Sequence, residues 1–216
     1  MNSSPDNQSD YWNRVAWTKD FTHPLDMDML RTFVDSDDTI VDFGCGYGRI
    51  VRELTESGFA HVSGYDTSEN MIARGKKLGV ANLLQIDSPS DLPIPDGTVD
   101  CVVLFAVLTC IPSNAGQREL LQILSSKLKK NGLLYISDYD LQDQPGQAKK
   151  EYQCWNGDSE NDGVFSHPEG AVFRHHSKQW LAALLEPWTI LCEKAISLTT
   201  MNGHTASGFQ MLVRKI

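Results

Sequence analysis

A glycine-rich turn between an apolar run and an amphipathic segment constrains the fold of this chain more than any other feature. Residues 41–49 read Val-Asp-Phe-Gly-Cys-Gly-Tyr-Gly-Arg. The largely β-branched and apolar run 39–43 predicts a strand, and residues 49–57 carry apolar side chains at helical spacing. Glycine is needed where a turn takes positive φ or where a ligand lies across a strand end. The segment therefore predicts a strand, a tight turn and a helix, with a ligand at the turn.

The alternation of strand and helix continues along the chain. Further strands are predicted at 61–65, 83–86, 99–105 and 133–137, and helices at 68–78, 117–129 and 179–185. Parallel strands joined by helices predict an α/β fold with a doubly wound, mostly parallel sheet. Two long, closely connected apolar segments, 188–200 and 206–215, predict a C-terminal antiparallel hairpin.

Three parts are expected along the chain. Residues 1–10 are polar and predict a mobile tail, and residues 11–38, with a helix at 25–34 that starts with Pro24 at its first position, predict a helical lid. Residues 39–216 form the main domain. Within it, the polar, glycine-containing stretch at about 140–176 lacks periodicity and predicts an insert that acts as a lid or binding loop.

Charge and composition limit the partners. The formal net charge of the 216 residues is -9, which gives no general attraction to nucleic acid or to anionic membranes. The longest apolar run, 99–111, is shorter than the roughly 20 residues that cross a bilayer. The N-terminus has no secretory pattern, and the five cysteines contain no C-x-x-C pair. We expect a cytoplasmic protein, monomeric or homodimeric, with a small-molecule partner and no nucleic acid, membrane or metal.

Acidic residues around the glycine turn indicate the cofactor. Asp66 ends the second strand, eighteen residues after Gly48, where a carboxylate can accept both hydroxyl hydrogens of an adenosine ribose. A dinucleotide fingerprint would place its third glycine at Arg49, and Asp42 would repel a pyrophosphate. Asp42 instead suits a cationic amino group. S-adenosylmethionine combines adenosine with an ammonium and a sulfonium.

Five segments in order resemble the class I S-adenosylmethionine-dependent methyltransferases: 41–49, Asp66, 85–88, 96–105 and 128–136. Val99 stands where that family more often has Phe, and Asn131 replaces a glycine or proline. The resemblance implies a Rossmann-like, seven-stranded fold, S-adenosylmethionine as cofactor and methyl transfer of the EC 2.1.1 type. We expect the cofactor at Asp42, Gly44, Cys45, Gly46, Gly48, Asp66, Thr67, Met71, Asp87, Ser88, Phe105 and Ala106.

Histidines are the candidate general bases, because their ordinary pKa lies near neutrality. The candidates are His23, His175 and His176; the last two are adjacent on a predicted strand, so at most one faces a shared site. Candidate substrate-binding residues are Tyr11, Trp12, Trp17, Thr109, Tyr139, Tyr152, Trp155 and Arg174. Packing within the core is the alternative role for each of them.

The acidic charge argues against a nucleic-acid substrate. The aromatic residues of the expected lid and the insert favour an enclosed pocket. We therefore expect methyl transfer to a small, aromatic or heteroaromatic acceptor by in-line displacement. Methylation of a protein or a transfer RNA, and binding of S-adenosylmethionine or its demethylated product without turnover, stay open. A nicotinamide oxidoreductase is disfavoured by Asp42 and Arg49.

Overall fold

The computed structural model describes residues 6–142, 152 and 162–216. Part of the predicted tail and much of the predicted insert, including Cys154 and Trp155, lie outside these residues. In the described part of the chain, no helix is long and apolar enough to span a bilayer.

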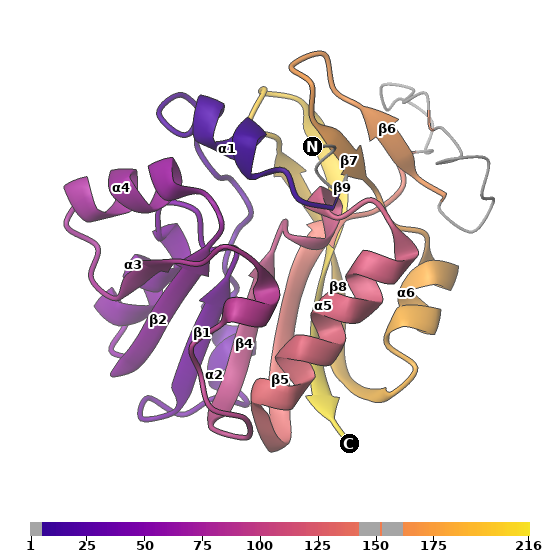
Figure 1. Cartoon of the computed structure of the whole chain (residues 1–216). Helices are drawn as coiled ribbons and strands as arrows, with labels where there is room; N and C mark the ends of the chain where they lie inside the picture. Colours follow the sequence, from indigo (N-terminus) through magenta and orange to yellow (C-terminus); the bar gives the residue numbers. More distant parts are fainter. Residues whose placement is uncertain (1–5, 143–151, 153–161) are drawn as a thin grey trace.

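A seven-stranded sheet in the order β3-β2-β1-β4-β5-β9-β8 forms the centre of the molecule (Figure 1). Its strands are β1 (Thr39–Phe43), β2 (His61–Asp66), β3 (Leu83–Gln85), β4 (Val99–Phe105), β5 (Leu128–Tyr139), β8 (Trp188–Thr199) and β9 (Thr205–Lys215). The first five run parallel, and β9 is antiparallel to both of its neighbours. The predicted Rossmann-like, doubly wound sheet with its C-terminal hairpin is confirmed.

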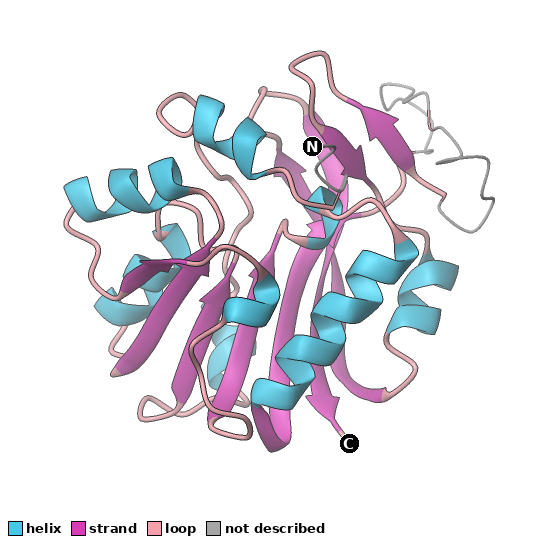
Figure 2. Ribbon diagram, in the orientation of Figure 1, coloured by secondary structure: helices cyan, strands magenta, loops and turns pink. Residues whose placement is uncertain are grey.

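Helices cover both faces of the sheet, as Figure 2 shows. One apolar cluster joins the sheet to α5 (Asn114–Lys127) and α6 (Lys178–Leu184), and another joins the opposite face to α2 (Met27–Arg31), α3 (Arg49–Glu56) and α4 (Glu69–Lys77). Both clusters consist of alternate residues of the same strands, because successive side chains of a strand point to opposite faces. The strands are therefore buried on both sides, and their carboxyl ends remain for a site.

Two additions lie over the carboxyl edge of the sheet. They are α1 (Ser9–Val15) and a small antiparallel pair, β6 (Val164–Ser166) and β7 (Val172–Arg174) (Figure 1). The segment 140–176 thus contains a hairpin that its sequence did not reveal, because three-residue strands are too short to show a period. Two short 3₁₀ turns, Pro89–Asp91 and Leu108–Cys110, complete the edge.

The helix expected at 25–34 is shorter and starts later. It runs from Met27 to Arg31, and the Asp26 side chain accepts a hydrogen bond from the Met29 amide at 2.9 Å. This acidic N-cap satisfies an amide that has no partner inside the helix. Pro24 lies before the helix and not at its first position.

Arg174 anchors the β6–β7 hairpin and does not face the sheet edge. Its guanidinium is fully buried and donates to the Pro112 carbonyl at 3.2 Å and to Asn114 Oδ1 at 2.7 Å. It also contacts Asp162 and lies over the ring of Trp180. The guanidinium makes its hydrogen bonds with these core partners, so the structure places Arg174 in a structural role and not in substrate binding.

His176 belongs to the same buried network. Its Nδ1 lies 3.2 Å from the Tyr139 carbonyl oxygen, and its Nε2 lies 3.0 Å from Nε2 of Gln117. Trp180 Nε1 donates to Gln117 Oε1 at 2.6 Å. Burial lowers the pKa of His176 to about 3, so the imidazole is neutral. Both ring nitrogens face core partners, and the structure therefore places His176 away from a role as general base.

The buried position of Arg174 generates a stability prediction. Arg174→Met removes the hydrogen bonds to the Pro112 carbonyl and to Asn114 Oδ1. We therefore expect a loss of about 2–4 kcal/mol in the free energy of unfolding. Urea unfolding followed by circular dichroism measures it. Arg118→Met is the matched control, because exposed Arg118 lies over the same Trp180 ring and should cost less than about 0.5 kcal/mol. Equal losses in both variants would contradict the anchoring role.

Candidate functional site

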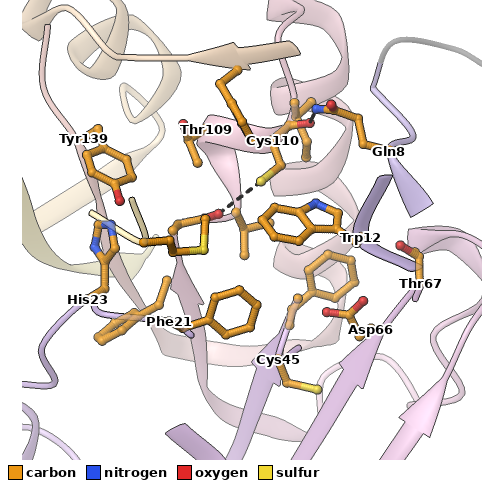
Figure 3. A pocket seen from close by; sticks show the side chains of 18 of the residues that line it. Gln8, Trp12, Phe21, His23, Cys45, Asp66, Thr67, Thr109, Cys110 and Tyr139 are labelled. Carbon is orange, nitrogen blue, oxygen red and sulfur yellow. Dashed lines mark hydrogen bonds between the residues drawn. The ribbon is translucent and has the colours of Figure 1, made fainter. Parts of the chain in front are cut away.

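A cavity of about 740 Å³ opens at the carboxyl edge of the sheet. Its walls come from the ends of β1, β2 and β4, from the N-terminal segment and from the β6–β7 and β8–β9 hairpins. Figure 3 shows Trp12, Phe21 and Tyr139 projecting into it from separate segments. The position is the one at which open α/β sheets bind ligands, because the loops that follow neighbouring strands diverge there.

The glycine turn leaves no room for side chains. Gly44, Gly46 and Gly48 all have positive φ, of 71°, 55° and 77°. A Cβ at Gly44 would lie 2.6 Å from Cγ2 of Val107, and one at Gly46 would overlap the ring of Phe21. Glycine is therefore required by backbone conformation and by close packing together.

Asp66 holds this turn in place. One carboxylate oxygen accepts the Gly46 amide at 2.7 Å, and the other accepts the Ser68 amide at 2.7 Å. Burial raises the pKa of Asp66, and the amides at Ser68, Gly46 and Thr67 oppose that change. A carboxylate oxygen accepts two hydrogen bonds, so each oxygen keeps capacity for a ligand hydroxyl.

Asp42 lies at the other side of the turn, inside β1. It is only 2% exposed, and its Oδ2 has no hydrogen-bond partner. Burial raises its pKa to about 8, Arg49 acts in the opposite direction, and the charges of Asp66 and Glu53 raise it further. An unpaired buried carboxylate is costly, and a bound cation would relieve that cost.

His23 is buried at the wall of the cavity. It is 4% exposed, its Nδ1 lies 3.1 Å from Ser137 Oγ, and its ring stands perpendicular to that of Tyr139 at 4.6 Å. Burial, and next the charge of Arg49, lower the pKa of His23 to about 3. The imidazole is therefore neutral, and its Nε2, which has no partner, belongs to a residue that lines the cavity.

His175 also lines the cavity. Its Nδ1 lies 2.9 Å from the Tyr152 hydroxyl, which also accepts the Gln142 amide at 2.7 Å. The rings of Phe165 and Tyr139 pack against it at 4.7 and 5.3 Å. Tyr152 itself is not a wall residue, and its contacts orient His175.

The N-terminal segment, residues 6–21, contributes to the cavity wall and is hydrogen-bonded to the rest of the protein at two places. Gln8 donates to the Cys110 carbonyl at 2.7 Å (Figure 3) and accepts the Val172 amide at 2.8 Å. On the other side, Asn13 accepts from the Ser68 hydroxyl at 2.7 Å. Residues 6–10, part of the predicted tail, thus have defined contacts.

The aromatic residues of this segment have three different environments. Trp12 lines the cavity. Tyr11 is buried beside it, donates its hydroxyl to Glu169 at 3.1 Å and packs against Phe173. Trp17 is 51% exposed and lies below Lys77, outside the cavity.

Most of the residues predicted to bind ligands meet at this one cavity. Those that line it are Trp12, His23, Asp42, Gly44, Cys45, Asp66, Thr67, Met71, Asp87, Ser88, Phe105, Ala106, Thr109, Tyr139 and His175. Those outside its wall are Tyr11, Trp17, Gly46, Gly48, Tyr152, Arg174 and His176. Gly46 is covered by Phe21, and Gly48 packs on Val80 and Leu83, so both act through the shape of the turn.

Several wall residues were not predicted. Phe165 and Phe173 belong to the undetected hairpin, and Asn202 and His204 belong to the turn between β8 and β9. The glycine at 163 and the Pro-Glu-Gly sequence at 168–170 were signals of a hairpin that could have identified the first pair. Arg49, which stands where a dinucleotide fingerprint would have its third glycine, also lines the cavity.

Comparison with known proteins agrees with this geometry. Residues 21–186 match a family described as a methyltransferase domain. The ribosomal protein L11 methyltransferase of Shewanella halifaxensis is 30% identical over 141 residues, which cover 62% of this chain and 45% of that protein. The chain thus spans less than half the length of that curated relative.

Solved structures share the fold. A methyltransferase from Methanosarcina mazei superposes with a TM-score of 0.73 at 22% identity, covering 87% of this chain and 97% of the other. The 1,6-didemethyltoxoflavin-N1-methyltransferase of Burkholderia thailandensis was solved with 1,6-didemethyltoxoflavin and S-adenosylhomocysteine bound. It superposes with a TM-score of 0.61 at 17% identity, covering 87% of this chain and 75% of the other. With the family match over residues 21–186 and the glycine turn clamped by Asp66, the chain belongs to the S-adenosylmethionine-dependent methyltransferases.

Proposed function

We propose that the protein methylates a small aromatic or heteroaromatic molecule. One observation supports this most directly: the cavity continues from the glycine turn into a space walled by aromatic side chains. These are Trp12, Phe21, Tyr139, Phe165 and Phe173. Flat apolar walls bury a flat apolar acceptor, because ring faces and edges pack closely against each other.

The wall residues suit the two ends of the cofactor. Asp66, with Asp87 and Ser88 on the same side, would hold the adenosine, and Asp42 would hold the ammonium. S-adenosylmethionine supplies a methyl group already activated by its sulfonium. The chain therefore has to align an acceptor atom with that group and exclude water.

Among the three histidines considered as bases, His175 is the one we propose for this role. It lines the aromatic part of the cavity, and Tyr152 fixes its ring. His176 is enclosed by core partners, and the low pKa of His23 makes it a poor proton acceptor near neutrality.

The N-terminal segment and the β6–β7 hairpin are proposed to act together as a lid. Glu169, at the tip of the hairpin, accepts from the Tyr11 hydroxyl and pairs with Lys19 at 3.0 Å. Lys19 also donates to Asn202 in the β8–β9 turn at 2.8 Å. Three segments distant in sequence are thus joined across the cavity mouth, which favours an acceptor small enough to be enclosed.

A protein acceptor is the second candidate, because the relatives matched over part of their length are named ribosomal protein L11 methyltransferases. Enclosure of the cavity opposes this reading, since a protein side chain must enter from outside.

Incubation of the protein with labelled S-adenosylmethionine and fractionated cell extract tests the acceptor class. We expect label in the low-molecular-mass organic fraction and stoichiometric S-adenosylhomocysteine, both measured by mass spectrometry. Label found only in the protein fraction would overturn the small-molecule proposal in favour of the second candidate. Unchanged cofactor in every fraction would contradict turnover.

Asp66→Asn tests the proposal that Asp66 binds the adenosine of the cofactor. The variant loses one charged acceptor, so the Kd for S-adenosylhomocysteine should rise about 10–100-fold in calorimetry. Asp96→Asn is the control, because Asp96 is an exposed acid that pairs with Lys127 outside the cavity. Unchanged affinity in Asp66→Asn would contradict the assignment.

Asp42→Asn should change the stability of the ligand-free protein and its affinity for S-adenosylhomocysteine in opposite directions. The pKa of Asp42 in the folded protein is about 8, against an ordinary 3.8, so the folded form binds more protons between these values. The carboxyl group therefore destabilises the ligand-free fold increasingly as pH rises from about 4 to 8. We expect Asp42→Asn to raise the ligand-free Tm by several degrees at pH 8 and hardly at pH 4, while the Kd for S-adenosylhomocysteine rises. A lowered Tm at pH 8 would contradict this prediction.

A further inference from the structure

The hydroxyl group of Tyr139 lies in the cavity wall without a partner in the described part of the chain. Tyr139 is the last residue of β5, and its side chain projects into the cavity (Figure 3). None of the described residues forms a hydrogen bond with Tyr139 Oη, and this oxygen is not among the four unpaired polar atoms that those residues enclose completely. The hydroxyl is therefore accessible from the cavity, although the residue as a whole is only 8% exposed.

The ring of Tyr139 is fixed between two histidines. The ring of His23 stands perpendicular to it at 4.6 Å, and the ring of His175 packs against it at 5.3 Å. His23 Nδ1 lies 3.1 Å from the hydroxyl of Ser137. His175 Nδ1 lies 2.9 Å from the hydroxyl of Tyr152. Hydrogen bonds thus hold the two flanking rings, and the Tyr139 hydroxyl has a defined position before a ligand enters.

The backbone of Tyr139 is held by a buried carboxylate. Asp138 is fully buried, and one of its oxygens accepts the Tyr139 amide at 2.8 Å while the other accepts the Thr109 amide at 3.0 Å. The Tyr139 carbonyl accepts the His176 amide at 2.9 Å. Asp138 therefore joins the end of β5 to the 3₁₀ turn after β4, where Thr109 also lines the cavity. This part of the wall is preorganised, like the glycine turn.

The chemistry of the hydroxyl favours ligands that offer a lone pair. Burial, and next the charges of Asp138 and Cys110, raise the pKa of Tyr139, so the phenol stays protonated at neutral pH. The lone pairs of a phenol oxygen are shared with its ring, which makes the O–H group a better donor than the oxygen is an acceptor. A ligand that covers such a donor without accepting its hydrogen bond loses affinity, because the hydroxyl can no longer bond to water.

We propose that Tyr139 is a specificity-determining residue for the methyl acceptor, and that its hydroxyl donates to a carbonyl oxygen or a pyridine-type nitrogen of a heteroaromatic ring. Its neighbour His175 is the residue proposed above as the base, and two rings 5.3 Å apart can contact neighbouring atoms of one ligand. The acceptor class is therefore a heteroaromatic ring in which one atom separates a reactive N–H or O–H from a lone pair. The N–H or O–H meets His175, and the lone pair meets Tyr139. This inference rests on the proposed function.

Indole and 7-azaindole test the proposal as a matched pair. Both are flat bicyclic molecules with one N–H group. In 7-azaindole a pyridine-type nitrogen lies one atom away from that group, where indole has a C–H. Calorimetry measures the binding of each compound to the protein saturated with S-adenosylhomocysteine. We expect the wild type to bind 7-azaindole about 5–20-fold more tightly than indole, and Tyr139→Phe to reduce this ratio to about twofold or less.

Tyr135→Phe is the matched control. Tyr135 lies on the same strand, its hydroxyl accepts the Asp26 amide at 3.2 Å, and it is not part of the cavity wall. This variant should keep the full preference for 7-azaindole. In both variants the Kd for S-adenosylhomocysteine should stay within about twofold of the wild type, because neither hydroxyl contacts the cofactor. Thermal unfolding checks that both variants are folded.

Each outcome decides one question. Equal binding of the two compounds by the wild type, or a preference that Tyr139→Phe keeps, would overturn the role of Tyr139 and leave the proposed function standing. Weaker binding of S-adenosylhomocysteine by folded Tyr139→Phe would also overturn that role, because the hydroxyl would then belong to the cofactor site. A wild type that binds S-adenosylhomocysteine but neither compound would overturn the aromatic acceptor of the proposed function, and the role of Tyr139 with it.

Discussion

The carboxylate of Asp66 is the contact on which the site depends. It accepts amides from the glycine turn and from the start of α4, at Gly46 and Ser68, and so joins β1, β2 and two helices at one point. The three glycines allow this turn many backbone conformations, and the fixed carboxylate supplies a constraint that such a turn needs. The shape of the cavity floor follows from this single group.

The cavity wall retains polar groups that the ligand-free fold does not satisfy. Asp42 and His23 are almost completely buried, and each has an unpaired atom. The burial of these unpaired groups lowers the stability of the fold. The apolar clusters on the two faces of the sheet, which include most of the buried side chains, offset this loss. A preorganised site of this kind gives up stability so that binding requires little rearrangement.

The two sides of the cavity are held by different kinds of contact. The residues proposed to hold the cofactor sit on strand ends and on the first turns of helices, which strand pairing and core packing fix. The proposed acceptor side is built from α1, the β6–β7 hairpin and the β8–β9 turn, and these are joined through Glu169 and Lys19. Contacts between exposed or half-buried groups are weaker than strand pairing, so we expect this side to open more readily.

Local patterns in the sequence determined the order of strands and helices, the glycine turn and the acids at the strand ends. These features are readable because apolar periodicity and the demand for positive φ act over a few residues. The pattern did not reveal the three-residue strands of the hairpin, the burial of His23, or the structural partners of Arg174 and His176. Tertiary packing decided these, since whether a polar atom finds a partner depends on segments more than a hundred residues apart, such as His23 and Ser137.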